Sequence, residues 1–174
     1  MKILDIVAHP HLAQSNVNRI WMKRLNQEEN ITVHDLYSTY PNGIIDVNKE
    51  QQLLSEHDRI IFQFPMYWYS SPSLLKEWQD VVLTYGWAYG SNGTKLRGKD
   101  FILAISIGGS EANYQAGGSN QFSVSELVKP FQATANLTGM RFLPVFKKLG
   151  VRLFSSEEIQ QSAEELVKYL KAEH

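Results

Sequence analysis

The sequence predicts a single α/β domain with a doubly wound parallel sheet. The chain has 174 residues, of which 43% are hydrophobic. This is enough for one core and too little for two ordinary domains, so we expect residues 1–174 to form one domain. From end to end, short β-rich runs alternate with helical patterns, and this alternation is typical of βαβ units around a parallel sheet with helices on both faces.

Five runs have the character of strands. They are Ile3 to Ala8, Ile31 to Leu36, Arg59 to Phe64, Asp100 to Ile107 and the shorter Arg141 to Phe146. Three of them are apolar enough to be buried on both faces, as expected when helices cover both sides of a parallel sheet.

Apolar residues at helical spacing lie between the strands. A helix is predicted from Pro72 to Tyr85, with Ser71 as its cap and Pro72 in its first position. The last helix begins with a capping-box pattern from Ser155 to Glu158. Pro130 interrupts the pattern before the fifth strand, where we expect a kink or a restart.

Composition excludes several classes of function. Seventeen basic and eighteen acidic residues leave a formal charge of -1, which gives no field for nucleic acid or an anionic membrane. Cysteine is absent, which fits a reducing compartment and removes thiolate chemistry. The first residues lack the apolar core of a secretory signal, and no uncharged stretch could span a membrane, so we expect a soluble, cytoplasmic protein. His9 and His11 lack carboxylate or cysteine companions, and we expect no metal site.

The turn after the first strand suggests an anion site. It lacks the G-x-G-x-x-G of dinucleotide folds, which argues against a Rossmann domain. Instead the run from His9 to Asn18 places hydroxyl and amide groups at a helix N-terminus, where free N–H groups favour a phosphate. Ser and Asn are also ordinary helix caps, and that alternative stays open.

Two further loops should share this site, because ligands of doubly wound sheets lie beyond the carboxyl ends of the strands. After the third strand come three consecutive aromatics, Tyr67, Trp68 and Tyr69. After the fourth strand come Gly108 and Gly109, which let backbone approach a planar ligand closely. A flat ring between the two loops fits this pattern, while the alternative is that the aromatics plug the end of the core.

The chain resembles a known family. The segments that carry the resemblance are His9-Pro10 with Ser15, Pro65 to Trp78, Gly86 to Gly90, Lys95 to Lys99, Gly108-Gly109 and Pro130 to Gly139. In this order they are similar to the quinone-reductase branch of the flavodoxin-like superfamily. Within that branch they most resemble bacterial NAD(P)H oxidoreductases described as general stress proteins and as ancillary subunits of glutathione-gated potassium efflux systems.

The resemblance implies which residues meet a flavin. It places the flavin phosphate among His9, Ser15, Asn16, Val17 and Asn18, and the ring between Pro65, Met66, Tyr67, Trp68 and Tyr69 on one side and Ser106, Gly108 and Gly109 on the other. It makes Tyr114 the catalytic residue, near the pyrimidine end of the flavin, where a phenol stabilises developing negative charge. Relatives often have a histidine in the loop that follows, whereas this chain has Asn120, which cannot titrate.

The resemblance also implies a function. The expected enzyme is an NAD(P)H dehydrogenase of the quinone type, with a ping-pong hydride mechanism and quinones or similar electrophiles as acceptors. FMN is expected rather than FAD because the chain is short, and either NADH or NADPH is the donor. Two alternatives are a flavin-bearing regulatory subunit of a potassium efflux transporter and a flavodoxin-type electron carrier without a substrate of its own.

Aromatic residues predict a homodimer. One chain of this size has limited core for Trp68, Trp78, Tyr85, Trp87 and Tyr89, and clustered Trp and Tyr are typical of interface cores. The resemblance implies the same, with partner residues lining the nicotinamide and quinone pocket. The alternative is a satellite cluster under the loop from Ser91 to Gly98.

Overall fold

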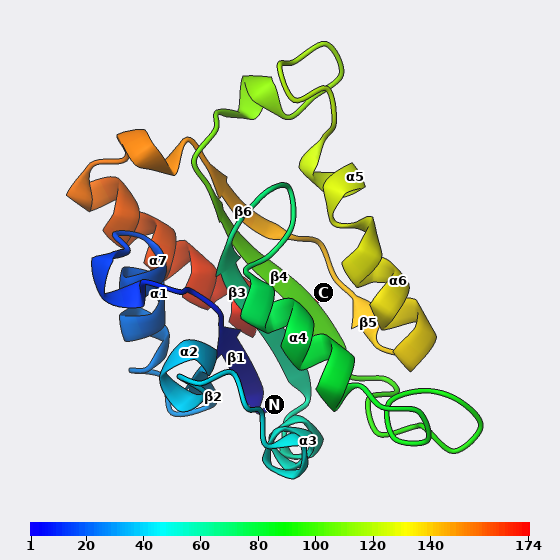
Figure 1. The fold of residues 1–174 in the computed structure, drawn as a ribbon. Coiled ribbons are helices and arrows are strands. Elements are labelled where there is room, and N and C mark those ends of the chain that lie inside the picture. Colours follow the sequence, from blue (N-terminus) through cyan, green and yellow to red (C-terminus); the bar gives the residue numbers. More distant parts are fainter.

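A parallel sheet forms the centre of the protein, of which a computed structural model describes residues 1–174 (Figure 1). Its strands are β1 (Ile3–Val7), β2 (Ile31–Asp35), β3 (Arg59–Pro65), β4 (Asp100–Ile107), β5 (Arg141–Phe142) and β6 (Phe146–Leu149). The order is β2-β1-β3-β4-β5, and β6 also pairs with β4. This is the flavodoxin-like order, which confirms the predicted fold class.

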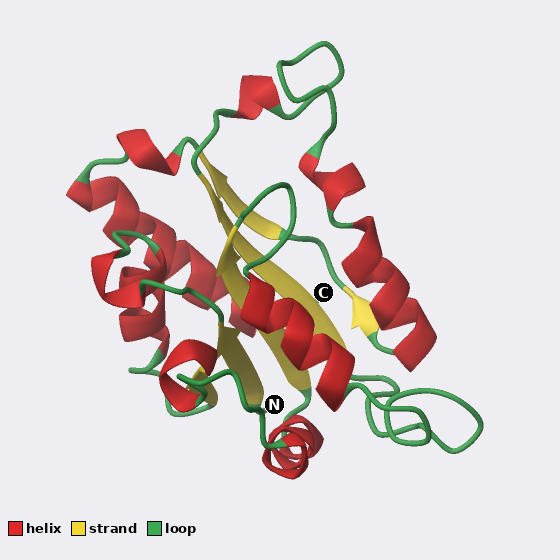
Figure 2. Ribbon diagram, in the orientation of Figure 1, coloured by secondary structure: helices red, strands yellow, loops and turns green.

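Helices cover both faces of the sheet (Figure 2). They are α1 (Asn18–Leu25), α2 (Leu36–Thr39), α3 (Val47–Glu56), α4 (Ser73–Val82), α5 (Val124–Leu127), α6 (Lys129–Thr138) and α7 (Ser156–Lys171), with 3₁₀ turns η1 (Leu12–Gln14), η2 (Glu111–Asn113) and η3 (Val151–Leu153). Residues of α1 and α7 form one core cluster with the sheet, and residues of α3, α4 and α6 contribute to the other. None of the helices combines the length and apolar character that a bilayer crossing requires.

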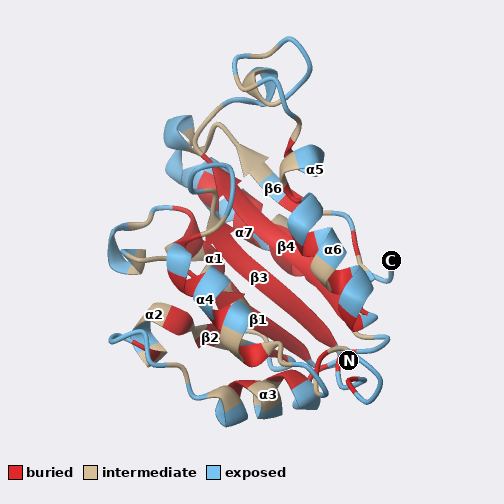
Figure 3. Ribbon diagram, turned by 45° about the vertical axis from the view of Figure 1, so that its right-hand side comes forward, coloured by how far each residue is buried: buried red, intermediate tan, exposed pale blue.

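The central strands of the sheet are buried on both faces. Every residue of β1 and β4 is buried, and so is every residue of β3 except Pro65 (Figure 3). This confirms the three strands expected to be buried on both faces, because each packs against helices above and below.

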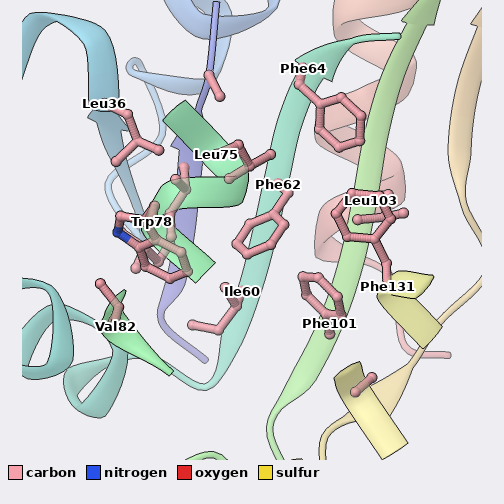
Figure 4. Close-up of a cluster of buried hydrophobic side chains, with 14 of the residues drawn as sticks. Leu36, Ile60, Phe62, Phe64, Leu75, Trp78, Val82, Phe101, Leu103 and Phe131 are labelled. Atoms are coloured by element: carbon pink, nitrogen blue, oxygen red, sulfur yellow. The ribbon is translucent and has the colours of Figure 1, made fainter. Parts of the chain in front are cut away.

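An aromatic core fills the face under α4 and α6 (Figure 4). The Phe62 ring meets Trp78 edge-on at 5.5 Å and Phe101 at 4.8 Å between ring centroids. Trp78 is fully buried, and its Nε1 donates to Glu50 Oε2 at 2.8 Å. Of the five aromatics for which the core had limited room, Trp78 is therefore one that the core holds, and it is not available to an interface.

Several element boundaries differ from the prediction. The fifth strand is two short strands, β5 and β6, separated by a segment containing Pro144, which has no N–H for a ladder hydrogen bond. Helix α4 ends at Val82, and its cap is Pro72 without a side-chain hydrogen bond, so Ser71 does not cap it. Helix α3 lies in a region for which the sequence predicted no helix. The restart at Pro130 and the Ser155 capping box are confirmed.

Candidate functional site

A cavity of about 250 Å³ lies beyond the carboxyl ends of β1, β3, β4 and β6. We call it the cofactor cavity. Its lining consists of His9, Ser15, Asn16, Val17, Asn18, Pro65, Met66, Tyr67, Ser106, Gly108, Val151 and Arg152. Three of its four segments are the loops that the sequence singled out, and the fourth follows β6. Of the remaining predicted residues, Trp68 and Tyr69 lie in the β3 turn, and Gly109 and Tyr114 lie in the β4 loop, outside this lining.

Free backbone donors lie just before α1 and in its first turn, and two of these residues, Asn16 and Val17, line the cavity. The residue in the N-cap position is Val17, but Ser15 Oγ accepts from the Asn18 N–H at 3.1 Å and so satisfies the first N–H of the helix. The N–H groups of Asn16, Val17, Arg19 and Ile20 donate to no acceptor of the chain. Because the helix dipole is positive at this end, this turn suits a phosphate.

The aromatic loop is a tight, strained turn. Tyr67 and Ser70 exchange backbone hydrogen bonds of 3.1 and 2.9 Å, and the two residues between them, Trp68 and Tyr69, have φ of 47° and 62°. Bulky residues adopt this left-handed conformation only under constraint, and such strain is common at ligand sites. Trp68 is 93% exposed and Tyr69 is 47% exposed, so these side chains do not plug the core. The N–H groups of Trp68 and Tyr69 have no partner in the chain.

The two glycines after β4 make room for side chains. A Cβ at Gly108 would lie 2.6 Å from Arg152 Nε, and a Cβ at Gly109 would lie 3.0 Å from the Tyr114 ring. The Gly109 carbonyl also accepts from Gly150 N at 2.8 Å. The glycines therefore let Arg152 and Tyr114 approach the site, a role that the sequence did not indicate.

Tyr114 has the electrostatic setting of a neutral hydrogen-bond donor. Burial raises the pKa of its phenol, Tyr69 raises it further, and Arg152 lowers it in part. The Tyr69 hydroxyl donates to Asn120 Oδ1 at 3.3 Å. Asn120, in the loop where relatives often have histidine, therefore accepts a hydrogen bond from the aromatic turn.

A buried network supports the floor of the cavity. Asn18 Nδ2 donates to Ser106 Oγ at 2.8 Å, and Gln63 Nε2 donates to the Asn18 backbone oxygen at 2.9 Å. Asn18 and Ser106 are nearly inaccessible to solvent. The Asn18 side chain thus joins α1 to β3 and β4 and positions the turn from His9 to Asn18, which we call the anion loop.

Arg152 is the residue that sequence reasoning missed. It lies in η3, directly after β6, and it lines the cavity together with Val151. The available signal in the sequence was Gly150, a glycine shortly before Arg152; in the structure its φ is 70°.

His9, by contrast, was predicted. Burial lowers the pKa of its imidazole and nearby His11 lowers it further, while Asp35 opposes both. No group of three or more histidine and acidic side chains could hold a metal ion.

The geometry agrees with what a comparison of sequences finds. A family model described as the flavodoxin-like fold matches residues 1–171. The chain belongs to this family. A relative in Bacillus subtilis, the uncharacterized NAD(P)H oxidoreductase YrkL, is 64% identical over 174 residues, which is 100% of both chains. The ancillary protein KefG of the glutathione-regulated potassium-efflux system of Serratia proteamaculans is 44% identical over 142 residues, 82% of this chain and 78% of KefG.

Solved structures of this flavodoxin-like family show the same fold. General stress protein 14 of Treponema denticola, crystallised in complex with FMN, is 42% identical with a TM-score of 0.94, and the match covers 98% of both chains. An NADPH-quinone reductase of P. pentosaceus is 36% identical with a TM-score of 0.91 over 100% of both chains. The family that the sequence motifs predicted is therefore confirmed.

Proposed function

We propose that this protein is a flavoprotein oxidoreductase that binds FMN in the cofactor cavity and transfers two electrons from NADH or NADPH to a quinone or a similar electrophile. The observation that carries the proposal is the convergence of an open helix N-terminus with a strained aromatic turn in one cavity. The FMN complex of a relative that is 42% identical supports the choice of cofactor.

The residues present fit FMN. The free N–H groups of Asn16 and Val17, which line the cavity, would hold its phosphate, with the Ser15 hydroxyl ordering the turn. The partnerless N–H groups of Trp68 and Tyr69 would meet the polar edge of the ring. FMN, when bound, supplies the two-electron chemistry, accepting from the nicotinamide and giving to the acceptor.

The side chains of the site orient the bound molecules and stabilise developing negative charge. Tyr114 keeps its proton and donates a hydrogen bond where negative charge develops, and Arg152 adds a positive charge on the same edge. Trp68 and Tyr69 present exposed aromatic surface on which a flat nicotinamide or quinone can stack. One open face serves the donor and the acceptor in turn, which is the basis of a ping-pong cycle.

The decisive experiment uses the purified protein. The absorption spectrum should show a flavin, and mass spectrometry of the released cofactor should identify FMN. Oxidation of NADH and NADPH should then depend on an added quinone, with parallel lines in double-reciprocal plots. A colourless protein that takes up neither FMN nor FAD would overturn the proposal.

A second function is a regulatory contact with a potassium efflux transporter. The observation that favours it is the 44% identity with KefG, which is ancillary to such a system. Co-sedimentation with membranes that contain the transporter, against membranes that lack it, tests this function. Equal sedimentation with both would exclude it.

A second copy of the chain would complete the site. Trp68 is 93% exposed and Tyr85 is 70% exposed, whereas Trp87 and Tyr89 pack partly against the chain's own core. Trp68 lies in the turn before α4, beside the cavity, and Tyr85 lies past the other end of α4. Exposed aromatics are typical of interface cores. We therefore propose a homodimer in which these side chains are covered.

A further inference from the structure

Three buried polar atoms below the cofactor cavity have no hydrogen-bond partner. They are Oδ1 and Oδ2 of Asp5 and Oε1 of Gln63. Asp5 is aligned with Ile61 of the neighbouring strand, so Asp5 and Gln63 share one face of the sheet at diagonal positions, within reach of long side chains. If Asp5 were ionised, all three atoms would be acceptors, and no hydrogen bond could join them.

The orientation of the Gln63 amide is fixed by the backbone. Its terminal atom lies 2.9 Å from the Asn18 carbonyl oxygen, which can only accept, so this atom is the nitrogen. Gln63 Oε1 is therefore the amide atom that needs a donor. Flipping the amide to satisfy an ionised Asp5 would bring two oxygens together at this distance.

Further hydrogen bonds lead from Gln63 toward the cavity. Asn18 Oδ1 accepts from Gln63 Nε2 at 3.3 Å, which leaves Asn18 Nδ2 to donate to Ser106 Oγ at 2.8 Å. The Ser106 oxygen accepts this bond, and its own proton has no acceptor in the chain. Ser106 lines the cofactor cavity, so that proton is available to a ligand there.

We propose that Asp5 is a neutral carboxylic acid and the first donor of a buried relay, from Asp5 through Gln63 and Asn18 to Ser106, that directs the Ser106 hydroxyl proton toward the cofactor. Small side-chain rotations or one buried water close the first link. Asp5 touches no cofactor and is a positioning residue. The relay rests on the proposed function, because the ligand that the Ser106 proton would meet is FMN.

The surroundings of Asp5 favour the neutral form. Burial raises the pKa of its carboxyl to about 8. Arg59 lies on the same face of β3, but Asp100 and the carbonyls of Leu170 and Ala172 bind its guanidinium. The other charged residues of β2, α1 and α7 are at least partly exposed; they are Asp35, Arg19, Lys23, Arg24, Glu157, Glu158, Glu164, Glu165, Lys168 and Lys171. His34 is on the opposite face of β2. No cation is left to stabilise a carboxylate.

Infrared spectroscopy of the flavin-free protein tests the state of Asp5. The difference spectrum between wild type and Asp5→Asn at neutral pH should contain the carbonyl stretch of a protonated carboxylic acid, shifted in D₂O. Asp100→Asn is the matched control, because Asp100 is also a buried aspartate but has two ion-pair partners, Arg59 and Arg141. Absence of the acid band would overturn the proposal, and this readout does not depend on flavin binding.

A double-mutant cycle on FMN affinity tests the relay itself. Asp5→Leu and Ser106→Ala should each weaken FMN binding by a factor of about 2 to 10, the range for one hydrogen bond. The double variant should be no weaker than Ser106→Ala, and Asp5→Asn should restore binding because its amide can donate to Gln63. Gln63→Met replaces Asp5→Leu if that variant does not fold.

Two outcomes would overturn the relay: additive effects of the two substitutions, or no rescue of FMN binding by Asp5→Asn. A wild type that binds no flavin would overturn the proposed function instead, and the infrared test would still decide the protonation state of Asp5.

Discussion

Asn18, the first residue of α1, donates from its side chain to Ser106 near the end of β4 at 2.8 Å, across 88 residues of sequence. This bond joins the anion loop to the strand whose loop carries the glycines. Both residues are buried, so the site is held from below by groups that solvent does not reach.

Asn18→Leu should lower the free energy of unfolding by about 1 to 3 kcal/mol, because the buried hydrogen bond to Ser106 Oγ is lost while Gln63 keeps its bond to the residue 18 backbone oxygen. Urea unfolding of the flavin-free protein measures the change. Asn16→Leu, an exposed neighbour in the same loop, should stay close to wild type. Equal stability of both variants would show that the bond to Ser106 carries no free energy.

Arg152→Met should weaken FMN binding several-fold, because a charged donor next to Gly108 is lost from the cavity. Fluorescence titration of the flavin-free protein measures this affinity. Lys147→Met removes an equal charge from β6 at a residue outside the cavity and serves as the control. If both variants bind FMN with the same affinity, Arg152 affects binding only through the net charge of the protein.

Tyr114→Phe should slow flavin reduction by about tenfold and leave flavin content intact. Aligned electrostatic donors are worth about 2.7 to 4 kcal/mol, and a partly solvated phenol gives less. Stopped-flow reduction with NADH and with NADPH measures the effect, and Tyr169→Phe, in α7 and outside the cavity lining, is the control. Unchanged rates with both donors would make Tyr114 a packing residue.

Sedimentation equilibrium should report twice the chain mass of 19.9 kDa. Trp68→Asp and Tyr85→Asp should shift the protein toward monomer with loss of activity, because each puts a charge in place of an exposed aromatic side chain that the partner would cover. Trp87→Asp should do the same, although its ring also packs against the core. Ile44→Asp, which changes an exposed apolar residue between α2 and α3, is the control. A fully active wild-type monomer is incompatible with the proposed dimer.

Glu50→Gln should destabilise the protein by about 2 kcal/mol at neutral pH, because a buried carboxylate loses charge-assisted hydrogen bonds. Burial raises the pKa of Glu50, but bonds from His34, Tyr40 and Trp78 outweigh it and lower the pKa below its ordinary 4.5. Since the folded-state pKa is the lower one, this stabilisation is complete above pH 4.5 and is lost as the pH falls through the folded-state value.

Thermal unfolding across the acid range measures this difference. The gap between wild type and Glu50→Gln should be constant near neutrality and should close at acid pH. Glu29→Gln, at an exposed position, should follow wild type throughout. A gap that does not change with pH would mean that Glu50 acts without its charge.

The sequence by itself determined the alternation of strands and helices, apart from α3 and the division of the fifth strand, the presence of three strands buried on both faces, and three of the four segments around the cavity. These features follow from local patterns: apolar runs, helix periodicity, and loops at the carboxyl ends of strands. The tertiary structure alone brought Arg152 to Gly108, buried Trp78 against Glu50, and joined Asn18 to Ser106 above the partnerless Asp5. Each of these contacts depends on how the crossover connections pack segments that are far apart in the sequence against one sheet. The spacing of residues along the chain does not predict such contacts.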